Sequence, residues 1–236
     1  MDFFFTCGLI AVIALLAIIA MAIGAYYEKK RREALEKVAG ELGLEFFPQG
    51  IPGLLESVRG YSLFKDGRGH SVTNTIRGVT DDVELTIFDF TYTTGSGKNS
   101  HTHRQTMIGL VSPRLDLSDF SLTPEHFFHK IAKLFGMKDI NFEEDSRFSS
   151  AFILQGAHEA GVRKMFSPPL REWCAQRTGS SAAGRGRQLF FFRAGQRVNP
   201  DKIAGLLEEG LQLFKLVAMP AGESQPPDSQ PTAGIM

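Results

Sequence analysis

The chain has 236 residues, of which 43% are hydrophobic and 22% are charged. This composition is typical of a protein with a packed core, so it excludes a chain that is disordered throughout. Its 26 Lys and Arg residues balance 26 Asp and Glu residues, which leaves a formal net charge of zero. Because no global field attracts nucleic acid, we expect no nucleic-acid partner.

Residues 1–27 predict a transmembrane anchor. No charged residue occurs between Phe3 and Tyr27, a stretch long enough to cross a hydrocarbon core of about 30 Å. Tyr26 and Tyr27 occupy the position of an interfacial aromatic belt. A basic cluster follows them, made of Lys29, Lys30, Arg31 and Arg32.

The direction of the anchor follows from this cluster. Only Asp2 carries a side-chain charge before the span, so the positive-inside rule places the N-terminus outside and the rest of the chain in the cytoplasm. We therefore expect a single-pass protein of the inner membrane. The alternative is a cleaved signal peptide, but such a peptide would begin with a basic region.

Three further segments follow the anchor. Residues 28–43 predict a juxtamembrane helix, because Leu35, Val38 and Ala39 recur on one helical face and Gly43 is a typical helix end. Residues 44–219 predict one cytoplasmic domain. Residues 220–236 are rich in Pro, Ser, Gly and Gln, and this composition predicts a disordered tail.

The first half of the domain is rich in β-branched and aromatic residues. Turn sequences separate its apolar runs, which predicts an antiparallel meander. The expected strands are residues 44–47, 61–64, 70–79, 83–94 and 103–111.

In the strand at 83–94, Ile87 alternates with Phe88 and Phe90 on the opposite face, so either both faces are covered or a bulge switches them. Asp89 is expected on a solvated face, and a carboxyl group with a shifted pKa is the alternative.

The second half of the domain mixes helices with strands. A hydroxyl cap followed by Pro124 predicts a helix that runs to about residue 135. Further helices are expected at 158–166, 168–176 and 200–217, strands at 141–142 and 148–154, a small-residue loop at 178–186, and a hairpin formed by 188–193 and 196–198. The fold class is therefore α+β: a transmembrane helix, then one domain with an antiparallel meander and several packed helices.

No pattern in the chain identifies a reaction. The run from Gly95 to Lys98 resembles half of a phosphate-binding loop, but Tyr92 replaces its first glycine and no helix follows. Two histidine pairs have spacings compatible with a metal, His101 with His103 and His126 with His129. No sequence motif supplies a third zinc ligand, and Cys174 is expected to be a buried structural thiol, so we expect no catalytic residue, metal or cofactor.

The strongest candidate binding element is the tip of the hairpin at residues 95–104. It contains Lys98, His101, His103 and Arg104 and no acidic residue. Its glycines allow the backbone to expose N–H donors, which suits an anionic partner such as an acidic lipid, a phosphorylated ligand or a cluster of carboxylates. The alternative is that the tip is polar to remain in water and basic to protect strand ends from pairing.

Several short runs resemble a known group of proteins. They are Thr75 to Gly78, Thr86 to Lys98, Arg104 to Thr106, Arg147-Phe148, Gln155-Gly156 and Val162 to Pro168. Together they resemble a group of uncharacterised bacterial membrane-anchored proteins over about residues 60 to 215. The resemblance implies a bacterial source and an anchored layout, and it implies no catalytic residue or cofactor.

The sequence favours a tethered, non-catalytic interaction or scaffold module, bound to the bilayer through its helix and to an unidentified protein or anionic partner. A membrane-surface hydrolase and a ligand sensor are the alternatives. A deep cleft with converging polar groups would favour an enzyme, an internal cavity a sensor, and an apolar patch or open sheet edge a scaffold.

Overall fold

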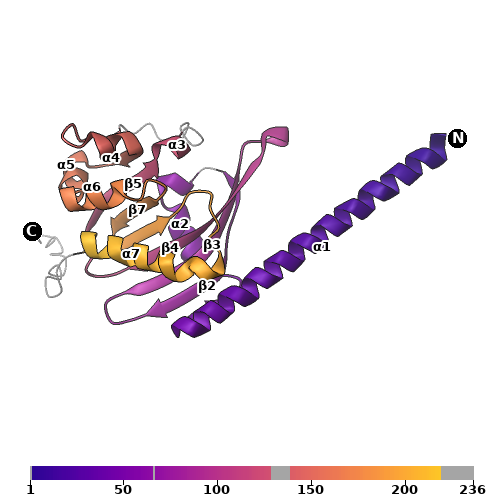
Figure 1. The fold of residues 1–236 in the computed structure, drawn as a ribbon, viewed down its shortest axis with the longest axis horizontal. Helices are drawn as coiled ribbons and strands as arrows, with labels where there is room; N and C mark the ends of the chain where they lie inside the picture. The colour runs from indigo at the N-terminus through magenta and orange to yellow at the C-terminus, as the bar shows by residue number, and fades with distance from the viewer. Residues whose placement is uncertain (1, 66, 129–138, 219–236) are drawn as a thin grey trace, which may run out of the picture.

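The chain begins with one long helix, α1 (Asp2–Leu42), which projects away from the rest of the molecule (Figure 1). The computed structural model describes residues 2–65, 67–128 and 139–218. Within α1, the stretch Val12–Leu42 contains a window of mean hydropathy 1.7 with no buried residue, long and apolar enough to span a membrane. The predicted anchor and juxtamembrane helix are therefore parts of one continuous helix.

The C-terminal part of α1 packs along the domain. Leu35 and Ala39 are buried there, as their spacing predicts. The helix ends in a left-handed turn at Gly43, whose N–H donates to the carbonyl of Gly40, while that of Leu44 donates to the carbonyl of Ala39. Because the chain reverses at this turn, the domain lies beside the helix.

The domain is built on one eight-stranded sheet in which every pair is antiparallel. The strands lie in the order β1-β2-β3-β4-β8-β7-β5-β6. The first four confirm the predicted meander. The bounds are β1 (Glu45–Phe47), β2 (Arg68–Val79), β3 (Glu84–Thr94), β4 (His101–Val111), β5 (Leu117–Pro124), β6 (Phe152–Gly156), β7 (Ser181–Gly186) and β8 (Gln188–Phe192).

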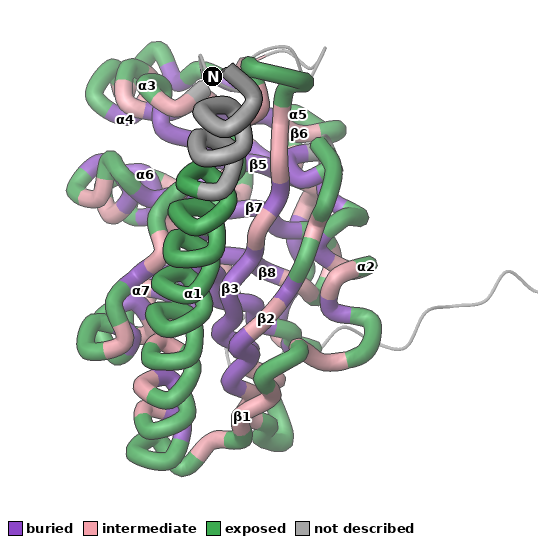
Figure 2. Tube along the Cα trace, turned by 90° about the vertical axis from the view of Figure 1, so that its right-hand side faces the viewer, coloured by how far each residue is buried: buried purple, intermediate pink, exposed green. Residues whose placement is uncertain are grey.

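Helices cover both faces of the sheet (Figure 2). On one face, α1, α6 (Pro168–Ala175) and α7 (Ile203–Val217) pack with Ile87 of β3. On the other, α2 (Leu54–Arg59) and the short helix η1 (Ser62–Phe64) pack with Phe88 and Phe90.

Covering both faces explains the irregular pattern of β3. Phe88 and Phe90 are 1% and 0% exposed, and Ile87 on the opposite face is 1% exposed. The alternative, a bulge in this strand, is not found, because the register between β3 and β4 is continuous; the irregularity lies in β2, between Thr73 and Ile76. The other elements are the helices α3 (Glu125–Phe128), α4 (Ser146–Ala151), α5 (Glu159–Met165), η2 (Gly97–Asn99) and η3 (Pro200–Lys202).

Several expected elements are wrong. Residues 61–64 contain a 3-10 helix, residues 141–142 are not a strand, and residues 196–198 do not pair as one. The predicted strand at 148–154 begins as helix α4, because the Asp145 side chain accepts a hydrogen bond from the N–H of Phe148 and caps it.

The expected loop at 178–186 is present only at residues 178–180, and the rest is an inner strand of the sheet, β7. Its small residues are required by packing, since a Cβ at Gly184 would lie 2.5 Å from the Phe120 ring. Strand β5, on which Phe120 lies, was not predicted. The predicted helix at 125–135 is present as α3 up to Phe128, and its remainder, together with the tail at 220–236, lies outside the described residues.

Candidate functional site

A buried ion pair joins α1 to the centre of the sheet. Arg31 of α1 binds Asp89 of β3 with both arms of its guanidinium group, Nε to Oδ2 at 2.8 Å and Nη2 to Oδ1 at 2.7 Å. The side chains of Arg31 and Asp89 are 13% and 2% exposed. The expected solvated position of Asp89 is wrong, because α1 covers this face of β3.

Further polar groups surround the two oxygens of Asp89. Arg197 donates to Oδ2 at 2.9 Å, Asn74 to Oδ2 at 3.0 Å, and the Thr106 hydroxyl to Oδ1 at 3.0 Å. Arg197 also pairs with Glu28, one turn before Arg31 on α1. Two arginines and two carboxylates therefore form a charge-neutral cluster, which we call the α1 junction: Glu28, Arg31, Asp89 and Arg197.

The junction keeps Asp89 ionised. Burial alone would raise the pKa of its carboxyl group, but hydrogen bonds from Arg31 and the charges of Arg31 and Arg197 outweigh burial and lower the pKa. Burying a charge is costly unless it is paired and hydrogen-bonded, and here every partner has a fixed position. The junction therefore sets how the helix is seated on the domain.

The α1 junction was not predicted from the sequence, although each of its two central residues has a local signal. Arg31 lies four residues before Leu35 and eight before Ala39, on the face of α1 that becomes buried. Asp89 is the only acidic residue in the apolar middle of β3, between Phe88 and Phe90. An Arg on an apolar helix stripe and an Asp in an apolar strand each indicate a buried charge that needs a partner, although neither position identifies the other.

The other residues predicted at the membrane interface stay on the surface. Tyr26 and Tyr27 are 63% and 64% exposed. Lys30 and Arg32 are exposed, and Lys29 lies 3.8 Å from Glu33 on the same helix. Among the four basic residues of this cluster, the structure turns Arg31 alone into a buried ion pair with the sheet.

The predicted binding element forms the end of the β3–β4 hairpin, with η2 at its tip. Lys98, His101 and Arg104 are exposed. His103 is half-buried: its ring stacks on Tyr92, with centroids 4.7 Å apart, and its Nε2 lies 2.8 Å from the Thr94 hydroxyl. The structure thus brings the four predicted residues to one end of the hairpin, with His103 in a supporting position.

Arg68, at the start of β2, braces this tip and was not predicted. Its guanidinium group donates to the carbonyl of Gly95 and, at 2.8 Å, to the hydroxyl of Ser100. Gly95 has φ of 74°, and a Cβ there would lie 2.1 Å from the carbonyl oxygen of Asn99. The tip is therefore a defined turn that requires glycine at this position.

An open cleft of about 730 Å³ lies beside the hairpin end. It forms because β4 pairs with β8 only from Met107 onward, so the first part of β4 diverges from the chain that follows β8. Gln105 bridges the start of this gap by accepting the N–H of Gly195 at 3.1 Å. The lining residues are Thr94, His101, Thr102, His103, His126, Phe127, Ala194 and Gly195.

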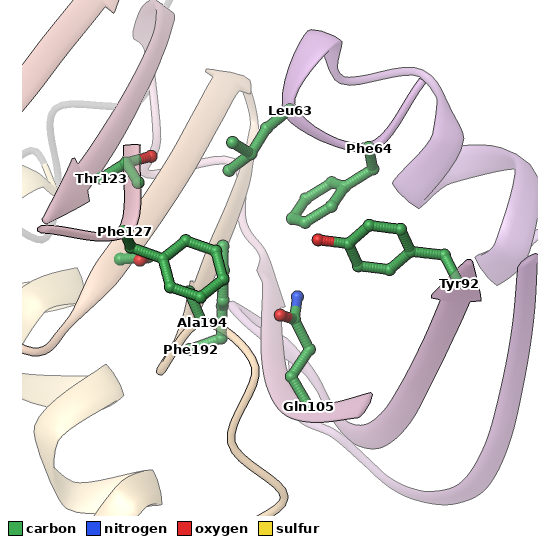
Figure 3. Close-up of a pocket in the computed structure, with 9 residues that line it drawn as sticks. Leu63, Phe64, Tyr92, Gln105, Thr123, Phe127, Phe192 and Ala194 are labelled. Carbon is green, nitrogen blue, oxygen red and sulfur yellow. The ribbon is translucent and has the colours of Figure 1, made fainter. Parts of the chain in front are cut away.

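Behind the cleft lies a narrow inner slot, which shares Phe127 and Ala194 with it (Figure 3). The Tyr92 hydroxyl and the Gln105 amide point into this slot, between the rings of Phe64 and Phe127. Burial raises the pKa of Tyr92 to about 12.

The inner slot also contains an unsatisfied polar group. Ser181 lines it, and its buried hydroxyl has no hydrogen-bond partner among the described residues. A buried polar atom without a partner is uncommon and calls for an explanation in terms of water, strain or a ligand.

The remaining candidates for chemistry are placed as follows. Within the described residues, no group of three or more His, Cys, Asp or Glu side chains is arranged to hold a metal ion. His126 lies at the cleft, while His129 is outside the described residues. Cys174 is buried in α6, and burial raises the pKa of its thiol to about 12, in agreement with a structural thiol.

Comparison with known proteins supports the fold alone. No protein-family model matches the chain, and no curated protein matches its sequence. Among solved structures, the chain is similar to the crystal structure of the mycobacterial trehalose monomycolate transport factor A, with a TM-score of 0.55 and 11% sequence identity over 86% of this chain and 98% of that one. The molecule is thus an α+β domain with an N-terminal helix that could span a membrane, in a fold shared with that transport factor.

Proposed function

We propose that this protein is a membrane-anchored, non-catalytic interaction module of the bacterial inner membrane, with its domain in the cytoplasm. The observation that carries the proposal is the α1 junction. A domain that needed only to stay near the membrane could hang on a flexible linker, whereas Arg31 and Asp89 fix this domain to its anchor through buried hydrogen bonds. Fixed seating is useful when a binding surface must meet a partner at a set position beside the bilayer.

The hairpin end is the binding surface that we propose. Lys98, His101, His103 and Arg104 all lie in this part of the hairpin, and loops held by a rigid scaffold carry function more often than the scaffold does. The similar solved structure is named as a transport factor. An auxiliary role in transport at the membrane, carried out with a partner bound at the hairpin end, is the role that we propose for this chain.

A membrane-surface enzyme is the second candidate, because the cleft beside the hairpin is open and lined partly by polar side chains, whereas a ligand sensor would need an internal cavity. The two buried groups that suggest catalysis in sequence, Asp89 and Cys174, are engaged in ion pairing and in core packing. These placements favour binding over a hydrolase mechanism, because a catalytic group must reach a substrate.

Site-specific crosslinking tests the proposed surface. A photo-reactive amino acid at Asn99, in the full chain in native membranes, should form an adduct with the partner. The adduct should disappear in the variant Lys98→Ser/His103→Ser/Arg104→Ser. The matched control places the same amino acid at His158, which is exposed beside α5. Equal adducts from both positions, or an adduct unaffected by the triple variant, would contradict the hairpin as the binding surface.

The orientation has its own test. A reporter that is active only in the cytoplasm, fused after Met236, should be active, and a reporter that works only outside the membrane should be silent. The reverse result would show that the basic cluster does not set the topology.

A further inference from the structure

The lining of the cleft is rich in hydrogen-bond donors. His101 and His126 reach it from two different elements, β4 and α3, and Thr102 adds a hydroxyl group. None of the described residues that line the cleft carries a carboxylate. A concave surface with donors and no acid is suited to an oxyanion, since phosphate presents several acceptor oxygens and a negative charge.

The exposed basic residues of the hairpin end, which do not themselves line the cleft, have the same sign of charge. Lys98 and Arg104 are exposed on the hairpin end, and neither has an ion-pair partner among the described residues. Elsewhere on the molecule, arginines such as Arg77, Arg147 and Arg193 are paired with carboxylates. The hairpin end therefore keeps a local positive charge on a chain whose net charge is zero.

The position of the hairpin relative to α1 indicates which kind of molecule would supply the oxyanion. In Figures 1 and 2 the end of the β3–β4 hairpin points to the same side of the domain as the N-terminal part of α1, which is apolar enough to span a membrane, and Figure 1 shows the hairpin end separated from the helix. The α1 junction holds this arrangement, because α1 and β3 are joined by the Arg31–Asp89 pair. The cleft is thus held on the membrane side of the domain.

The inner part of the cleft is apolar. Phe127 and Ala194 separate it from the slot lined by Leu63 and Phe64, where the Ser181 hydroxyl lacks a partner. A ligand that combines an oxyanion with an apolar body would meet both the donors and the apolar side chains of Phe127 and Ala194 in the cleft itself. Lipids have this combination, and free phosphate does not.

We propose that the cleft at the hairpin end binds the phosphate headgroup of an anionic lipid of the membrane that α1 spans. The positive charge of Lys98 and Arg104 on the hairpin end attracts the headgroup, and His101, His126 and Thr102 in the cleft donate hydrogen bonds to it. The proposal rests on the anchored arrangement of the proposed function and specifies one ligand of the same hairpin end.

The test uses the full chain in lipid nanodiscs and follows hydrogen–deuterium exchange of the amides of residues 95–104. Nanodiscs of phosphatidylcholine alone are compared with nanodiscs that also contain phosphatidylglycerol. With the anionic lipid at about ten times its dissociation constant, exchange at the hairpin end should slow by roughly tenfold. The protection should weaken at high salt, because salt screens the charges of Lys98 and Arg104.

Two variants locate the effect. Lys98→Ser/His101→Ser/His126→Ser should lose the protection, and the matched control His158→Ser/Lys164→Ser, which removes the same kinds of side chain at α5, should keep it. Equal exchange in both nanodiscs, or protection that survives in the first variant, would overturn the proposal.

Inorganic phosphate added to phosphatidylcholine nanodiscs separates the two sources of oxyanion. Protection by free phosphate without protection by phosphatidylglycerol would overturn the lipid assignment, whereas protection by phosphatidylglycerol at concentrations where free phosphate has no effect would support it. The crosslinked adduct at Asn99 is a separate measurement. Loss of lipid protection with a normal adduct would therefore count against this inference alone, and loss of the adduct with normal protection against the proposed partner surface alone.

Discussion

At the α1 junction, Arg31 and Arg197 lie against Asp89 with 13% and 20% of their side chains exposed. At the hairpin end, Lys98 and Arg104 are exposed and have no ion-pair partner among the described residues. The same kind of charge therefore has two different roles in one molecule. Where charges are buried and paired they fix geometry, and where they remain exposed and unpaired they are available to a ligand.

The largest effect is expected at the centre of the junction. Asp89→Ala leaves Arg31 and Arg197 without their shared buried partner, which should lower the free energy of unfolding by about 3–5 kcal/mol. Chemical unfolding of the full chain in detergent measures this loss. A variant as stable as the parent would show that the junction does not hold the domain.

A neighbouring residue supplies the control for Asp89→Ala. Phe90 points to the opposite face of β3, and Phe90→Ala should also cost about 3–5 kcal/mol by leaving a cavity. Only Asp89→Ala should speed hydrogen exchange in residues 28–40 of α1. Similar exchange of α1 in both variants would mean that the ion pair has no special part in seating the helix.

The pH dependence of the junction is expected to be confined to acid. The pKa of Asp89 lies below its ordinary value of 3.8, so its contribution is complete above that value and is lost as pH falls through the lowered pKa. The stability difference between the parent and Asp89→Asn should stay constant from about pH 8 to about pH 5 and shrink only below about pH 4. Unfolding curves across this range provide the measurement, and a difference that shrinks between pH 8 and 6 would contradict this assignment.

A smaller loss is expected when the charge of Arg31 is kept and its shape is changed. The Arg31 guanidinium group binds both oxygens of Asp89 and also donates to the carbonyl of Val198 at 2.8 Å. A lysine has no planar fork, so Arg31→Lys should cost about 1–3 kcal/mol. Arg32→Lys, on the exposed side of the same helix turn, is the control and should be neutral in the same unfolding assay.

The smallest effect on stability is expected at the hairpin end. In the variant Lys98→Ser/His103→Ser/Arg104→Ser, the two exposed sites, Lys98 and Arg104, should each change the free energy of unfolding by less than about 0.5 kcal/mol, because surface substitutions away from packed features are nearly neutral. The half-buried His103 should add no more than about 1 kcal/mol. A melting temperature within a few degrees of the parent's would agree with this. A large loss would assign these residues to the fold instead of to binding, with the His103–Tyr92 stack as the first place to look.

The helices and strands that could be predicted from the sequence are those that local signals determine. The apolar run to Tyr27, the stripe of Leu35 and Ala39 and the alternation in residues 83–94 each depend on neighbours within a few positions, and the structure contains the corresponding helix and strands. The proline-started helices α6 and the segment from η3 into α7 were likewise found from local signals.

What could not be predicted depends on distant partners. Strand β7 is predicted as a loop because its small residues have little strand propensity. The ring of Phe120 on the neighbouring strand β5 explains why position 184 must be glycine. Arg31 and Asp89 are 58 positions apart, so no local pattern joins them. The cleft has the same origin, since His126 and Gly195 reach the hairpin end only through the sheet order.

The seating of α1 also has a mechanical consequence. Residues 28–42 continue the helix for about 22 Å beyond the predicted span, at about 1.5 Å per residue. The domain packs against this C-terminal part of α1. Because the domain is fixed to α1, a rotation of the helix about its own axis also rotates the domain. Successive residues of an α-helix are rotated by about 100° about its axis. One residue inserted after Tyr27 would therefore rotate the hairpin end by about 100° around the anchor. If α1 spans a membrane as proposed, its length therefore determines the direction in which the hairpin end faces.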